Sequence, residues 1–89
     1  MARADVLSLE VLANTGSIGA RDAYFELGLV YCIGREVAAD LVVAHKWFNI
    51  SAMRGNRLAR EYRADVARDL TKMEVAKAQR LAREWLARH

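Results

Sequence analysis

The sequence predicts an all-α fold built from helical hairpins, and three observations support that prediction. The chain of 89 residues contains no proline, the residue that most often interrupts helices. Its apolar residues recur at helical spacing, and nowhere does an alternation typical of strands persist. Turn-forming clusters divide the chain into segments of helical length. A chain of this length forms one domain, here 1–89, with a thin core.

The first two segments of helical length lie before residue 35. Residues 5–13 form a short candidate helix that ends at a cluster of turn-forming residues, 14–17, and we expect it to cap the domain. Helical periodicity then covers 20–33. Gly34 is well placed to end this second helix in the left-handed backbone conformation that favours glycine.

The next helix is predicted to follow a loop over 35–39. Asp40 is a good N-cap, because its carboxylate can accept from the free backbone N–H groups of the first turn. The helix extends to about Met53, before Gly55 ends the segment. One face is apolar and consists of Leu41, Ala44, Trp47, Phe48 and Ala52.

Two more helices are predicted in the remaining chain. Asn56 can cap a third helix, whose apolar residues are Ala59, Tyr62, Val66 and Leu70. Thr71 and Glu74 have the spacing of a capping box, so a last helix begins there. Its apolar positions are Val75, Ala78, Leu81, Ala82 and Trp85. Two helical hairpins are therefore expected, over 20–55 and 56–89.

The chain also contains a weak internal repeat. Gly19 and Gly55 stand 36 residues apart, as do Ala23 and Ala59, and helix-pair repeats have periods of this size. The first hairpin is similar to the tetratricopeptide repeat, but its loop is four residues longer. With that loop, the chain resembles the related Sel-one-like repeat at Leu27, Gly28, Tyr31, Gly34, Val37, Asp40, Ala44, Trp47, Phe48, Ala52, Gly55, Asn56 and Ala59.

The resemblance implies how the first hairpin packs. Small residues, of which Gly28 and Ala44 are two, would let the antiparallel helices approach closely, while larger side chains fill the space beside them. The second hairpin departs from the family pattern, because Arg63-Ala64 stands where a repeat would have Leu-Gly. We therefore interpret 56–89 as a degenerate, capping repeat.

The resemblance also implies a function, that of a protein–protein interaction module without catalysis. In tetratricopeptide-like folds the first helices of the repeats line a concave binding surface. By position, that surface would comprise Asp22, Phe25, Leu29, Cys32, Leu58, Glu61, Asp65 and Arg68, with Phe25, Leu29, Leu58, Glu61 and Asp65 as the contact residues. The alternative is that the N-terminal helix or a second chain covers Phe25 and Leu29. Because repeats bury their apolar faces against neighbours, a homodimer is also expected.

The sequence gives no pattern for an active site, a cofactor or a metal. Cys32, His45 and His89 do not have the spacing of metal ligands. Cys32 is expected to be a small buried residue, His45 to lie on the surface, and His89 to be a mobile terminal residue. The serines lack the surroundings of a nucleophile.

Charge is distributed unequally along the chain and leaves a second function class open. Residues 1–53 contain four basic and six acidic residues, whereas 54–89 contain ten and five. A basic half is compatible with a helical nucleic-acid-binding protein, although interleaved acids argue against that alternative. Nothing resembles a signal peptide or a membrane span, and the one cysteine suits a reducing compartment, so a cytoplasmic location without membrane contact is expected.

Overall fold

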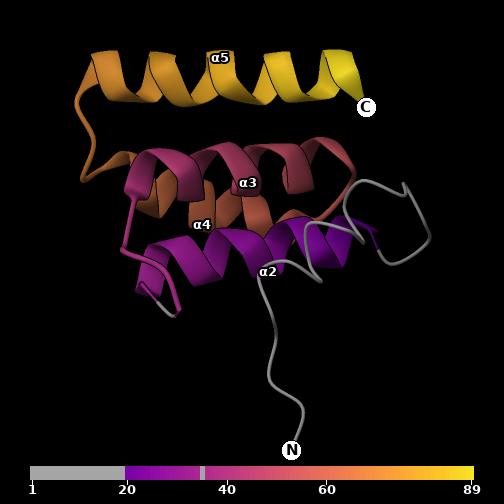
Figure 1. Cartoon of the computed structure of the whole chain (residues 1–89), viewed down its shortest axis with the longest axis horizontal. Helices are drawn as coiled ribbons and strands as arrows, with labels where there is room; N and C mark the ends of the chain where they lie inside the picture. Colours follow the sequence, from indigo (N-terminus) through magenta and orange to yellow (C-terminus); the bar gives the residue numbers. More distant parts are fainter. Residues whose placement is uncertain (1–19, 35) are drawn as a thin grey trace, which may run out of the picture.

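The computed structural model describes residues 20–34 and 36–89, and over these residues the prediction of an all-α fold is confirmed. Its helices are α2 (Ala20–Ile33), α3 (Leu41–Met53), α4 (Arg57–Ala67) and α5 (Lys72–Arg88). Figure 1 shows α5, α3 and α2 as three successive layers, with α4 behind α2 and α3. The candidate helix at 5–13 lies outside the described residues.

The first two helix boundaries follow from the predicted capping residues. Gly34 has φ of 83°, and its N–H donates to the Val30 carbonyl at 2.9 Å, so the chain turns as soon as α2 ends. The Asp40 carboxylate accepts from the backbone N–H groups of Val42 and Val43 at 3.1 and 3.2 Å. It thereby satisfies two of the unpaired donors in the first turn of α3.

The beginnings of α4 and α5 were also predicted correctly from their caps, but α4 ends at Ala67, before the Leu70 that was assigned to this helix. The Asn56 side-chain oxygen accepts from the Ala59 N–H at 3.0 Å. Thr71 and Glu74 form the capping box: the Thr71 N–H donates to the Glu74 carboxylate at 2.8 Å, and the Glu74 N–H donates to the Thr71 hydroxyl at 3.1 Å. Polar side chains therefore set where three of the four described helices begin.

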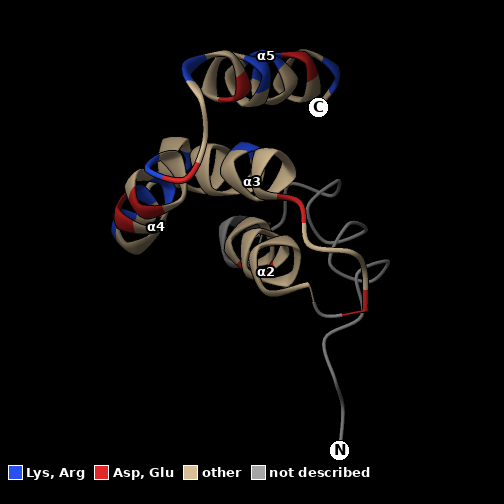
Figure 2. Ribbon diagram, turned by 90° about the vertical axis from the view of Figure 1, so that its left-hand side faces the viewer, with Lys and Arg blue, Asp and Glu red and all other residues tan. Residues whose placement is uncertain are grey.

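Helix α3 is the centre of the described fold, because α2, α4 and α5 all pack against it (Figure 2). The prediction of a single apolar face on α3 was therefore incomplete. Its buried residues extend around most of the helix and are Ala44, His45, Trp47, Phe48, Ile50, Ser51 and Ala52. His45 is only 3% exposed, so its predicted surface position was wrong: α4 covers the flank on which it lies.

The close approach predicted at Gly28 is confirmed. A Cβ atom added there would lie inside the van der Waals envelope of the Phe48 ring, at 2.9 Å from Cζ and nearer still to two other ring carbons. Phe48 is fully buried and cannot move aside. The missing side chain of Gly28 is thus what lets α2 and α3 pack at this separation.

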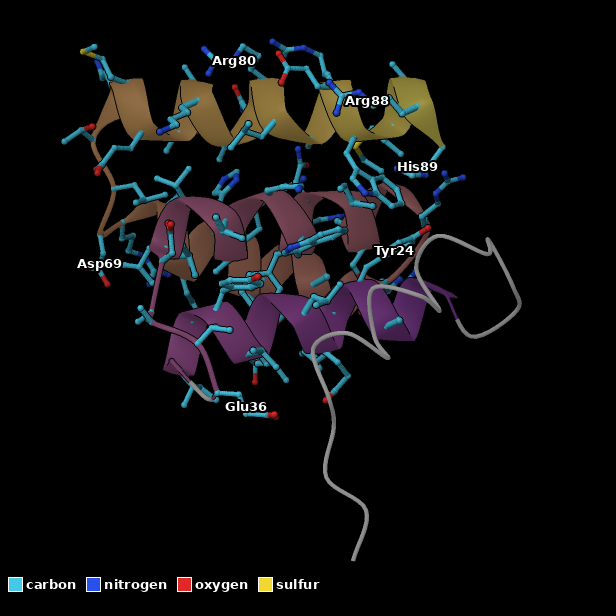
Figure 3. All side chains as sticks on the ribbon, in the orientation of Figure 1. Tyr24, Glu36, Asp69, Arg80, Arg88 and His89 are labelled. Carbon is cyan, nitrogen blue, oxygen red and sulfur yellow. The ribbon has the colours of Figure 1, made fainter. Side chains whose placement is uncertain are left out.

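Three aromatic rings join α2, α3 and α5 at one end of the core. Tyr24 stacks on Trp47 with ring centroids 6.2 Å apart, and both rings meet Trp85 edge-on at 5.4 Å. Figure 3 shows Tyr24 between α2 and α3, near the C-terminal end of α5. This cluster attaches α5 to the first hairpin, where Ala78 and Ala82 are also buried.

The expected hairpin packing of 56–89 is not how these residues are arranged. Helix α5 packs against α3, and its contact with α4 is slight in comparison (Figure 2). Two small residues, Ala78 and Ala82, lie in the contact with α3. Helices α4 and α5 therefore do not pack against each other as closely as α2 and α3 do.

Candidate interaction surfaces

The predicted contact residues of α2 lie in a partly covered aromatic cluster. The Phe25 ring is 5.7 Å from Phe48 and 5.1 Å from Tyr62, measured between centroids. Leu29 and Cys32 are also half-buried and pack against the core that contains Phe48. Phe25 is thus only partly accessible to a partner, because Tyr62 of α4 covers one side of its ring.

Helix α4 contributes the exposed apolar residues of the same surface. Leu58 is 48% exposed and Tyr62 is 36% exposed, and they lie one turn apart on the helix. Phe25, Leu29, Leu58 and Tyr62 are called the α2–α4 strip below. Tyr62 was predicted as one of the apolar residues of this helix, and the structure adds that part of the residue remains open to solvent.

The charged residues predicted for this surface are exposed on α4. Glu61 is exposed, and so is Asp65, which pairs with Arg68 at 2.8 Å. This ion pair joins residues three positions apart on the exposed surface of α4. Arg63 instead turns towards α3 and donates to the Asn49 side-chain oxygen at 2.6 Å.

His45 lies beside this Arg63–Asn49 bond. Its Nδ1 atom is buried and has no hydrogen-bond partner among the described residues. Burial lowers the pKa of His45 below its ordinary value of 6.5, and the positive charge of Arg63 lowers it further. The imidazole is therefore neutral near pH 7 and acts as part of the packing between α3 and α4.

The described residues provide no metal-binding cluster of histidines, cysteines or acids. Cys32 is a half-buried thiol, more open than the buried position predicted for it. The ring of His89 stacks on Trp85 at a centroid distance of 4.3 Å. None of the described helices is long and apolar enough to cross a membrane.

Charged residues gather on α4 and α5, whereas the ribbons of α2 and α3 contain few of them (Figure 2). On α5 the basic residues are all exposed: Lys72, Lys77, Arg80, Arg83 and Arg88. Figure 3 shows the Arg80 side chain pointing away from α3, on the outer face of the domain. The basic half predicted from the sequence is thus a solvated surface of two helices.

Comparison with known proteins gave no match among protein-family models, curated proteins or solved structures.

Proposed function

We propose that the chain is a non-catalytic protein–protein interaction module related to the Sel-one-like and tetratricopeptide repeats. The observation that supports this proposal best is the α2–α4 strip, where two helices present aromatic and aliphatic side chains that are only partly covered. Apolar side chains on neighbouring helices can hold the apolar face of a partner helix.

The charges beside the strip indicate which kind of partner helix would bind there. Glu61 and Asp65 are exposed on α4, on the side of Tyr62, and Asp65 is only partly compensated by Arg68. Rim charges of this kind mainly speed and orient association, while the apolar contacts provide the affinity. The strip therefore suits a partner helix with a narrow apolar face and a polar flank.

The experiment that tests this proposal changes exposed residues only, because Phe25 also supports the fold. We expect Leu58→Ser with Glu61→Lys to lose the proteins that wild type retains in an affinity pull-down. Met73→Ser with Glu84→Lys is the matched control, since it makes the same change in net charge and Met73 is 84% exposed on another helix. Circular dichroism should show both variants to be folded. If the Leu58 variant retains the same proteins as wild type, the strip is not the binding surface.

The alternative function, nucleic-acid binding through the basic α4 and α5 surfaces, predicts a different result. Binding to random DNA would then fall steeply with salt concentration, because phosphate contacts release counterions. If wild type retains nucleic acid and no protein, the proposal of an interaction module is wrong and the nucleic-acid-binding alternative is favoured.

A further inference from the structure

One stripe of the central helix α3 belongs to neither hydrophobic core cluster. Val42, Lys46, Asn49 and Met53 recur at the spacing that places residues on one side of a helix. Val42, Lys46 and Asn49 are half-buried and Met53 is 59% exposed. The partly buried neighbours Leu41 and Val43 pack against the core clusters instead. We call these four residues the α3 stripe.

The α3 stripe lies between α4 and α5. Both helices pack against α3, yet they have little contact with each other (Figure 2). The axes of packed helices lie about 8–10 Å apart. Only a few neighbouring helices therefore fit around a central helix, each against a different side of it. Among the described elements, α2, α4 and α5 fill three such positions around α3, and the stripe marks a fourth.

The flank of α4 beside the stripe is basic. Arg63 reaches Asn49 on the stripe at 2.6 Å, which identifies this flank, and Arg60 lies one turn away on the same side and is exposed. The acidic residues of α4 are on the other flank: Glu61 and Asp65 are on the side where Tyr62 meets α2.

The flank of α5 that faces the same side is basic as well. Trp85 lies against Tyr24 of α2, so the opposite flank of α5 is turned towards α4. That flank carries Lys72 and Arg83, both exposed, and no acidic residue. The α3 stripe therefore has basic residues along both sides. Its floor has an apolar residue at each end, Val42 and Met53, with Lys46, whose ammonium lies over the Trp47 ring, and Asn49 between them.

We propose that the α3 stripe docks an acidic amphipathic helix from a partner protein. The apolar face of that helix would cover Val42 and Met53 and fill the fourth position around α3. Its carboxylates would reach the guanidinium groups of Arg60 and Arg63 on one side and of Arg83 on the other. Arginine binds carboxylates in a two-pronged geometry, so these residues suit that role better than lysines would.

A partner protein fits this surface better than a nucleic acid does. Single strands are held by aromatic side chains on which bases stack, and neither the α3 stripe nor its arginine rim contains one. Duplex readers insert a protruding helix into a groove, whereas the stripe lies between two flanking helices. The surface is also separate from the α2–α4 strip, because the two lie on opposite flanks of α4.

The test uses a labelled synthetic helix as the probe, about four turns long, with leucines on one face and glutamates beside them. Fluorescence anisotropy measures its binding to the full chain. We expect Arg60→Glu with Arg83→Glu to weaken binding by at least about tenfold, since two carboxylate contacts become repulsive. Arg68→Glu with Arg88→Glu changes the net charge equally but away from the rim, since Arg68 pairs with Asp65 on the other flank of α4, and should weaken binding by less than about twofold.

A third variant tests the floor of the stripe, and circular dichroism tests the folding of all variants. Met53→Glu is exposed enough to leave the fold intact and should also weaken binding of the acidic helix. Equal weakening by the rim and the control variants would overturn the proposal, because binding would then follow net charge alone. Binding of a single-stranded oligonucleotide at the rim arginines, with no binding of the acidic helix, would also overturn it.

Discussion

Replacement of Gly28 by alanine tests the packing of α2 on α3 most directly. In an exposed helix this change stabilises a protein by about 1 kcal/mol, because alanine has the higher helix propensity. At Gly28 the added Cβ would overlap three carbons of the Phe48 ring, the farthest at 2.9 Å, and Phe48 is fully buried. Overpacking of this kind costs about 1–3 kcal/mol, so the expected sign is reversed.

Urea denaturation measures the difference in the free energy of unfolding between wild type and Gly28→Ala. Ala64→Gly, at an exposed position of α4, measures how much helix propensity alone contributes. In a Phe48→Leu background Gly28→Ala should cost less stability than it does in wild type, because the smaller side chain leaves room for the Cβ. A Gly28→Ala protein as stable as wild type, or more stable, would refute the close approach of α2 and α3.

Three further predictions concern the core, a titration and assembly. Trp47→Ala should lower the free energy of unfolding by about 3–5 kcal/mol, because the residue is 5% exposed and its ring contacts two other rings. Thermal melting measures this loss of stability. An unchanged melting temperature would contradict the prediction. Since the pKa of His45 is lowered by folding, stability should be full above pH 6.5 and fall as the pH drops through the window below it. In His45→Leu that part of the fall should disappear from urea titrations. Light scattering at micromolar concentration should show twice the chain mass of 10.0 kDa, and a strict monomer would exclude the expected homodimer.

The helix boundaries could be predicted from the sequence because local interactions determine them. Asp40, Asn56 and Thr71 each accept from backbone N–H groups within three residues, so their effect does not depend on the rest of the fold. Gly34 acts locally too, through a backbone conformation that other residues rarely adopt.

The burial of His45 could not be predicted in the same way, because it depends on which helices surround α3. Periodicity indicates that a helix has an apolar face, and it does so for Trp47 and Phe48. It does not indicate that a third helix will cover a polar flank. Ile50 was missed for a related reason: its side of α3 is buried by packing that no local pattern specifies.

The partly covered position of Phe25 also required the structure. The sequence placed Phe25 on the first helix of one expected hairpin and Tyr62 on the first helix of the next, but it did not indicate the contact between their rings, whose centroids are 5.1 Å apart. That contact makes Phe25 a supporting residue of the fold, so the exposed Leu58 is the better residue with which to test binding.

Gly28 and Arg63 show why α2 and α4 pack on α3 in different ways. Gly28 lets α3 approach α2 to the contact distance of the Phe48 ring. Arg63 cannot be covered in that way without losing solvation of its charge, and it instead lies over Asn49. Helix α5 packs by its alanines on another side of α3, and the α3 stripe is left between two basic flanks. Arg63 thus borders both the contact of α4 with α3 and the surface on which we expect an acidic helix to dock.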